Sequence, residues 1–162
     1  MSRGISFEKH DHASCVNEAL DVADQFCKAH KLQLTKVRRR VLEILLGQHK
    51  AIGAYDILAQ LKAEGLGSQP PVVYRALDFL VSHNFVHKVE KLNAYVACSH
   101  SGQHHSPAFM ICRMCDAVAE MQTSPKAGVF GATAREIGFE IENAVIEAEG
   151  ICPSCQKDDA AQ

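Results

Sequence analysis

The sequence contains no long apolar run, no secretion signal and no internal repeat. No run approaches the roughly 20 apolar residues that cross a bilayer, which argues against a membrane protein. The opening residues, MSRGISFEKHDHAS, lack the apolar core of a secretory signal, so we expect a cytoplasmic protein. The chain has 162 residues, 47% hydrophobic and 22% charged, which is typical of one ordinary folded domain or two small ones.

The sequence also lacks a large excess of either charge. The formal net charge is −2, which by itself does not indicate a nucleic-acid partner. Residues 1–90 carry 12 Lys and Arg against 10 Asp and Glu, whereas residues 91–162 carry 5 against 9. The front half is therefore slightly basic and the back half slightly acidic, which alone is weak evidence of function.

Hydrolytic zinc motifs are missing as well. A zinc hydrolase or deaminase needs three protein ligands, an open position for water and an acid–base carboxylate. Neither H-E-x-x-H nor the H-x-E and P-C-x-x-C combination occurs in the sequence. We therefore predict that the protein is not an enzyme.

Cysteine and histidine are plentiful, with seven and nine copies. In a reducing cytoplasm, metal binding is a better explanation for them than a disulfide framework.

Two C-x-x-C pairs, Cys112/Cys115 and Cys152/Cys155, have 36 residues between them (116–151). Each turn presents two thiolates, and two turns supply the four corners of a zinc tetrahedron. The gap exceeds the ~15–20 residues of zinc ribbons but fits one helix and one strand. A redox C-x-x-C motif would be single and would lie beside the start of a βαβ unit, and neither condition holds here. Disulfides and inert thiols remain the alternatives.

A second group of residues, which comprises two histidines, one cysteine and one glutamate, could also bind metal. Each of them also has a purely structural interpretation. A lone strand histidine is often only half-buried, and a cysteine can be a small core residue. An unpaired carboxylate among apolar neighbours would be costly. His100 and His104 are rivals for membership. The candidates are His87, Cys98, His105 and Glu120.

The front half has the apolar spacing of helices. We predict a helix from about residue 17, a second with Thr35 as its N-cap and Gly47 at its end, and a third over 53–68. A fourth follows in SQPPVVYRALDFLVSHN. Here Pro71 fits the first helical position, and the proline after Pro70 keeps Pro70 outside the helix.

The fourth predicted helix has a clear inner and outer face. Its inner face comprises Val73, Leu77, Leu80 and Val81. Tyr74, Arg75 and Asp78 remain outside, near the helix start. An outward arginine there suits a helix that enters a DNA major groove, because its fork can bind guanine. A plain surface helix is the other interpretation.

Alternating stretches over 85–89 and 94–98, around a turn at EKLN, predict a hairpin, so that the front half forms a winged helix.

In the back half, strands flank the first C-x-x-C. A helix with Ser124 as N-cap and Gly138 just past its end follows, before a last strand. The predicted fold is α+β, with a flexible N-terminus (1–16), a winged-helix domain (17–98), a small α/β domain with a four-cysteine knuckle (99–156) and a loose tail (157–162).

Several stretches together resemble the ferric uptake regulator (Fur) superfamily, and most closely its zinc-uptake branch, Zur. They are LTKVRRRVLEIL, AYDILAQL, PPVVYRALDFL, FVHKVEKLNAYVAC, HSPAFMICRMC, VIEAEGIC and CPSC. The resemblance runs in order from about residue 17 to 156. It implies a bacterial homodimeric repressor in which residues 99–156 form the α/β dimerisation domain. Its zinc-loaded form would bind AT-rich palindromic operators of zinc-uptake genes.

The resemblance also implies residue roles and two zinc ions per chain. The structural site corresponds to Cys112, Cys115, Cys152 and Cys155. The regulatory site corresponds to His87, Cys98, His105 and Glu120. The DNA-contacting pair corresponds to Tyr74 and Arg75.

The sequence departs from the family pattern in three places. Lys36 and Val37 stand in LTKVR where members commonly have L-T-P-Q-R, and Val72 stands where a threonine is usual. The N-terminal HDHASC, with His10, His12 and Cys15, matches nothing in the pattern; it is either a weak extra metal site or a tail. If Cys98 is a ligand, the set favours zinc. If it is not, a sensor of iron or manganese remains. A zinc-binding protein without DNA activity is a separate alternative.

Overall fold

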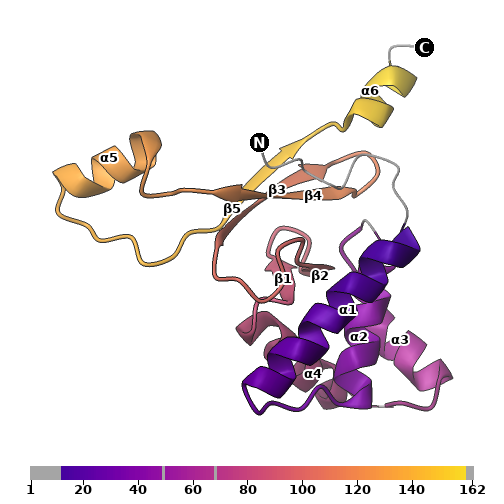
Figure 1. Ribbon diagram of the computed structural model, residues 1–162. Helices are drawn as coiled ribbons and strands as arrows, with labels where there is room; N and C mark the ends of the chain where they lie inside the picture. Colours follow the sequence, from indigo (N-terminus) through magenta and orange to yellow (C-terminus); the bar gives the residue numbers. More distant parts are fainter. Residues whose placement is uncertain (1–11, 49, 68, 160–162) are drawn as a thin grey trace. The chain divides into compact units, whose positions relative to one another are not determined.

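The computed structural model describes residues 12–48, 50–67 and 69–159 (Figure 1). These residues fall into two compact units. The first unit ends at Gln103 and the second begins at His104. None of the helices in the described ranges is long and apolar enough to cross a membrane.

The first unit contains four helices followed by a hairpin. Thr35 caps the second helix as predicted, because its side chain accepts a hydrogen bond from the backbone N–H of Arg38 at 3.3 Å. Gly47 is the C-cap of the same helix. The elements are α1 (His12–Ala29), α2 (Lys36–Leu46), α3 (Ala54–Ala63), α4 (Pro70–Ser82), β1 (Val86–Val89) and β2 (Ala94–Ala97).

The core of this unit lies between the helices and the hairpin. Helix α4 buries Val73, Ala76, Leu77 and Leu80 against it. The prediction for Val81 was wrong, because that side chain is 36% exposed. Ala76 lies one turn after Val73 and takes the inner position, so that the buried stripe follows i, i+3, i+4 and i+7.

The start of α4 also differs from the prediction. The helix begins at Pro70, one residue earlier than expected, with Gln69 as N-cap. Both prolines therefore lie in the first turn, where neither needs a backbone N–H.

The hairpin is the predicted wing. Strands β1 and β2 pair antiparallel, with Val86 opposite Ala97 and Val89 opposite Ala94. Tyr95 forms a further bridge with Ile52, and the two residues exchange backbone hydrogen bonds of 2.9 Å. This bridge attaches the wing to the segment between α2 and α3, which completes a winged helix.

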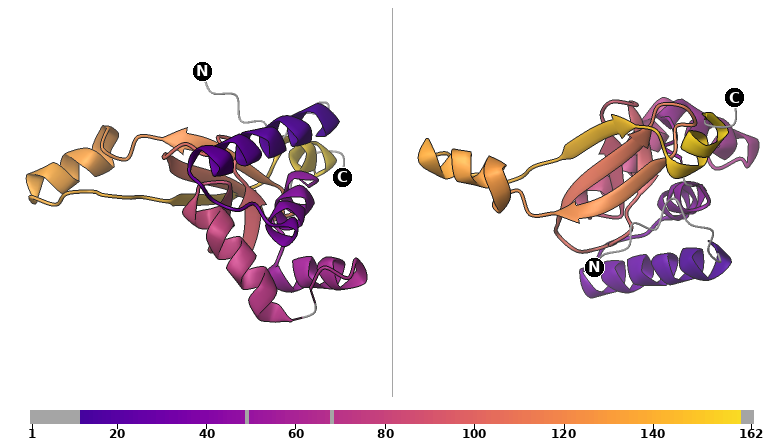
Figure 2. Two further views of the ribbon diagram at one scale, coloured as in Figure 1. Left: turned by 60° about the horizontal axis from the view of Figure 1, so that its bottom comes forward. Right: turned by 90° about the horizontal axis from the view of Figure 1, so that it is seen from above.

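The second unit is a three-stranded sheet with two helices. The strands lie in the order β4-β3-β5, side by side in Figure 2. Strand β3 pairs antiparallel with β4 and parallel with β5. The elements are β3 (Ser106–Cys112), β4 (Val118–Thr123), α5 (Gly128–Glu136), β5 (Ile146–Gly150) and α6 (Pro153–Asp159).

Helix α5 is shorter than predicted. Its N-cap is Ala127 and not Ser124, because the Ser124 carbonyl accepts the Ala127 N–H in a separate turn at 2.9 Å. Gly138 does lie just past the helix end, at φ 72°. Phe130 and Ile137 are 68% and 74% exposed within the single chain.

The ends of the chain differ from the predicted boundaries. Helix α1 already begins at His12, inside the stretch predicted as flexible, and α6 continues to Asp159, inside the predicted loose tail. Residues 1–11 and 160–162 lie outside the described residues. His10 is therefore not described, nor are the side chains of His12 and Cys15.

Candidate metal centres and nucleic-acid interface

The two C-x-x-C pairs meet because of strand register. Strand β5 runs parallel to β3 with Gly150 opposite Cys112, so that the chain leaving β5 reaches Cys152 beside the first knuckle. The Arg113 N–H donates to the Gly150 carbonyl at 2.9 Å and holds the two ends together. The 36-residue gap contains β4, α5 and β5, one strand more than the single helix and single strand expected for it.

The four sulfur atoms form one cluster. The Sγ atoms of Cys112, Cys115, Cys152 and Cys155 all lie within 4.8 Å of one another. Cys115 Sγ and Cys152 Sγ are 3.8 Å apart, which is also about the edge of a tetrahedron with Zn–S bonds of ~2.3 Å. All six cysteines with described side chains are outside disulfides. The cluster therefore fits a four-thiolate zinc site.

Backbone N–H groups favour ionisation of one of these thiols. The Cys152 N–H donates to Cys112 Sγ at 3.3 Å. Together with the N–H groups of Met114 and Cys115, it lowers the pKa of Cys112 to about 6. Hydrogen bonding with Cys152 and Cys115 raises the pKa of Cys155 to about 12. One thiolate forms readily, whereas four together need a cation to balance their charge.

The wing carries the first pair of regulatory candidates. His87 lies on β1 and Cys98 just after β2, and a ring nitrogen of His87 lies within 4.8 Å of Cys98 Sγ. The Cys98 N–H donates to the Phe85 carbonyl at 2.9 Å, which fixes its position beside β1.

A backbone group supports the Cys98 sulfur. The His100 N–H donates to Cys98 Sγ at 3.2 Å, and Ser101 Oγ donates to the Cys98 carbonyl at 3.0 Å. Hydrogen bonds of this kind stabilise a thiolate. No sequence pattern indicates the role of the His100 N–H, because every non-proline residue carries such a group.

The second unit carries the other pair. His105 precedes β3, and Glu120 lies in β4 opposite Phe109. His105 Nε2 lies 2.8 Å from Glu120 Oε1, and the two side chains are 6% and 5% exposed. Glu120 is thus a buried, partnered carboxylate and not a solvated one. Each unit therefore holds two side chains from the predicted set of four.

The rival histidines do not belong to either metal-ligating group among the described residues. The ring of His100 lies against Ser99 Oγ, with Nδ1 at 3.1 Å from the oxygen. His104 is exposed.

The predicted DNA-contacting residues are on the exposed side of α4. Tyr74 is 41% exposed, and Arg75 and Asp78 are exposed beside it. Their common helix is anchored by its buried stripe, so that their side chains point away from the core. On the neighbouring wing, Lys88 Nζ forms an ion pair with Glu90 at 2.9 Å.

Known proteins share this architecture. The profile of the ferric uptake regulator family matches residues 29–149. The zinc uptake regulation protein of Escherichia coli (strain K12) is 39% identical over 146 residues, covering 90% of this chain and 85% of that protein.

Two solved structures are also similar. A zinc uptake regulator complexed with zinc and DNA has a TM-score of 0.83 at 39% identity, covering 90% of this chain and 97% of that one. Holo XcZur has a TM-score of 0.77 at 34% identity, covering 87% and 99%. This chain belongs to the ferric uptake regulator family.

Proposed function

We propose that the protein is a zinc-responsive transcriptional repressor of zinc-uptake genes, acting in the cytoplasm. The observation that supports this proposal most directly is the distribution of metal ligands over the two units. One complete group of four lies within the second unit, whereas the other candidates are divided as two pre-formed pairs, one in each unit. The similarity to a zinc uptake regulator bound to zinc and DNA supports the same assignment.

The four-cysteine cluster would hold a structural zinc ion. Cys112, Cys115, Cys152 and Cys155 saturate a tetrahedral ion, so no position is left for water or substrate. Their role is to join the end of β3 to the start of α6. A site of this kind stabilises the fold and does not sense zinc.

The regulatory site would take one pair of ligands from each unit. His87 and Cys98 would bind the ion from the wing, and His105 and Glu120 from the sheet. A thiolate with two imidazoles and one carboxylate is a compact tetrahedral set suited to zinc. Six-coordinate iron or manganese would prefer ligands of oxygen and nitrogen alone. Binding of all four would limit the orientation of the wing relative to the sheet.

Helix α4 would read the operator. Tyr74 and Arg75 would enter the major groove, where arginine can bind guanine through two hydrogen bonds. A homodimer carries two such helices, and half-sites about 34 Å apart are read together only when the helices have the matching separation. We therefore expect palindromic operators, and the family resemblance implies that they are AT-rich.

The second unit would form the dimer. Helix α5 exposes Val129, Phe130 and Ile137 at 84%, 68% and 74%, more apolar surface than one short helix of a monomer normally leaves in water. Strand β5 is an edge strand of the sheet. A second copy of the chain would cover both.

Thermodynamic linkage between zinc binding and operator binding would account for zinc-dependent repression. If zinc binds the DNA-competent arrangement more tightly than the others, operator DNA must tighten zinc binding by the same factor. All ligands must be deprotonated, so acid weakens the response.

Replacing Cys152 with Ser should remove the structural zinc ion. Structural sites contribute about 10–16 kcal/mol of apparent binding free energy in zinc-finger peptides, so we expect the variant to lose dimerisation or solubility. Zinc content by elemental analysis and mass by light scattering measure this. Cys27→Ala is the matched control, since Cys27 is buried outside both groups. A Cys152→Ser protein with a normal dimer and unchanged zinc would contradict the structural role.

Replacing Cys98 with Ser should abolish zinc-dependent operator binding and leave a folded dimer with one zinc ion per chain. The loss should equal the allosteric coupling, about 5–150-fold in operator affinity. Gel-shift titration with and without zinc measures it, with Cys27→Ala again as control. An unfolded product would mean that Cys98 is structural.

Replacing Arg75 with Ala should reduce discrimination between operator and mutated operator by about 1–3 kcal/mol at the contacted base pair. Competition binding to duplexes with single base-pair changes measures the loss. Lys157→Ala removes a cation from α6, outside the DNA-binding unit, and should leave the discrimination intact. Unchanged sequence preference in Arg75→Ala would exclude its role in the groove.

A further inference from the structure

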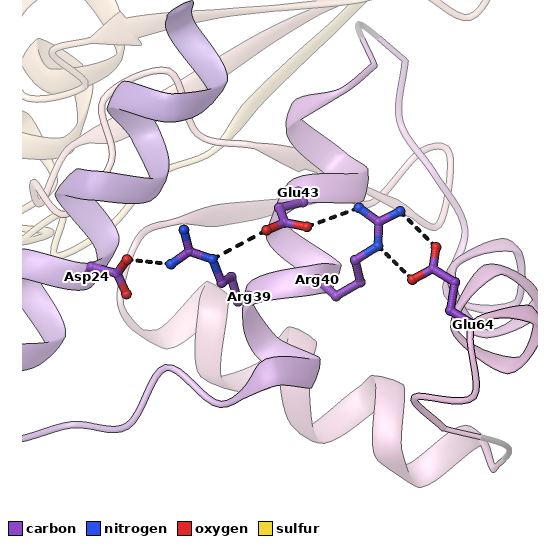
Figure 3. A network of polar contacts seen from close by, with 5 residues as sticks. All are labelled: Asp24, Arg39, Arg40, Glu43 and Glu64. Atoms are coloured by element: carbon purple, nitrogen blue, oxygen red, sulfur yellow. Dashed lines mark hydrogen bonds and ion pairs between the residues drawn. The ribbon is translucent and has the colours of Figure 1, made fainter. Parts of the chain in front are cut away.

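A polar network extends across three helices of the first unit (Figure 3). Arg39 on α2 pairs with Asp24 on α1, and Arg39 Nε lies 3.3 Å from Glu43 Oε1. Arg40 pairs with the other Glu43 oxygen at 3.0 Å and with Glu64 at the end of α3. The network therefore ties α2 to both of its neighbours.

Each of the three guanidinium nitrogens of Arg40 has a carboxylate partner. Its Nε and Nη2 donate to the two oxygens of Glu64, both at 2.7 Å, and Nη1 donates to Glu43 at 3.0 Å. Exposed single ion pairs contribute little, but a two-bond fork within a network has defined geometry. This pair can therefore hold Glu64 at a set position against α2.

Neighbouring Arg38 and Arg39 are engaged as well. Arg38 lies over the Phe79 ring at 3.7 Å and donates to the Gln33 carbonyl at 2.6 Å. Arg39 faces Asp24 and Glu43. The basic triplet 38–40 has the composition of a phosphate-binding segment, yet its charges are directed to partners within the unit.

Glu64 stands where the chain reverses after α3. It is the C-cap, and the Leu66 N–H returns to the Leu61 carbonyl at 2.9 Å, with Gly65 between them at φ 71°. This arrangement is a Schellman-type helix end. The position of Glu64 therefore sets the direction in which the chain leaves α3.

Gly67, which follows this helix end, lies against the start of α4. A Cβ atom on Gly67 would come within 3.0 Å of Val72 Cγ1, so the backbone there passes closely over the first turn of α4. Tyr74 and Arg75 follow directly along this helix. A shift at Glu64 would thus be transmitted over a few residues to the groove-facing side chains.

We propose that Arg40 and Glu64 are positioning residues for the recognition helix: their fork holds the α3–α4 connection and so aims Tyr74 and Arg75, and Arg40 does not bind a DNA phosphate. This inference rests on the proposed function, in which α4 reads the operator.

The rival role for Arg40, a phosphate contact, has a different salt signature. Each phosphate contact adds about 0.9 to the slope of log affinity against log salt concentration. A positioning residue changes the affinity and the sequence selectivity, and it leaves that slope unchanged. The two roles are therefore separable in one titration.

The test compares Arg40→Met, Glu64→Ala and the double variant, all zinc-loaded and of full length. The DNA probe is a duplex selected from a randomised pool by the zinc-loaded wild-type protein. We expect each single variant to weaken binding about three- to tenfold with the wild-type salt slope, and the double variant to be no weaker than the singles. Asp24→Asn is the matched control: it removes a carboxylate from the α1 end of the network and should leave operator affinity at the wild-type level.

Hydrogen exchange supplies a readout that does not involve DNA. The Leu66 amide should exchange faster in Arg40→Met and Glu64→Ala, and at the wild-type rate in Asp24→Asn. A salt slope lowered by about 0.9 in Arg40→Met would assign Arg40 to phosphate and overturn the proposal. The proposal would also be overturned if the Leu66 amide of Glu64→Ala exchanged at the wild-type rate and the variant bound the operator with wild-type affinity. If the wild-type protein selects no duplex, the proposed function fails, whereas exchange at Leu66 still decides whether the fork holds the connection.

Discussion

A tetrahedral zinc ion accepts four ligands. The two candidate metal groups differ in how their four ligands are distributed over the two units. The four cysteines all belong to the second unit, where the parallel register of β5 on β3 brings them together. An ion there can stabilise only that unit. The remaining candidates come as two pairs, one per unit, so neither pair alone satisfies zinc. The proposed sensing follows from this division, because completing the tetrahedron requires both units.

The polar groups of these pairs lie close together. His105 and Glu120 are within hydrogen-bond distance in a buried position, and the His100 N–H donates to the Cys98 sulfur. Side chains that such contacts hold in place lose less entropy when they bind a ligand. The proposed positioning of α4 by Arg40 and Glu64 would follow the same principle. In the proposed function, metal response and DNA reading would both depend on short polar contacts that fix the ends of secondary-structure elements.

Much of this organisation could be predicted from the sequence. Apolar spacing located the four front helices and the hairpin, and the C-x-x-C pairs located the thiolate cluster. Errors arose at the edges of predicted faces and at helix ends. Val81 lies to the side of the stripe of Val73, Ala76, Leu77 and Leu80, so it is exposed although its spacing from Val73 suited the inner face. Ser124 was a better N-cap by type than Ala127, but its carbonyl closes a turn instead. The parallel register of β5 and the Arg40–Glu64 fork pair residues distant in sequence, which local patterns do not encode. The division of the regulatory set between the wing and the sheet came from the family resemblance, and its role stays a prediction.

The most direct test of the account is the operator affinity of one protein preparation in two metal states. Mild chelation should remove the regulatory zinc and leave the four-cysteine site loaded, which elemental analysis checks as one zinc ion per chain against two. The account predicts that the stripped dimer binds its selected operator about 5–150-fold more weakly than the loaded dimer, and that added zinc restores the affinity. Equal affinities in the two states would contradict it.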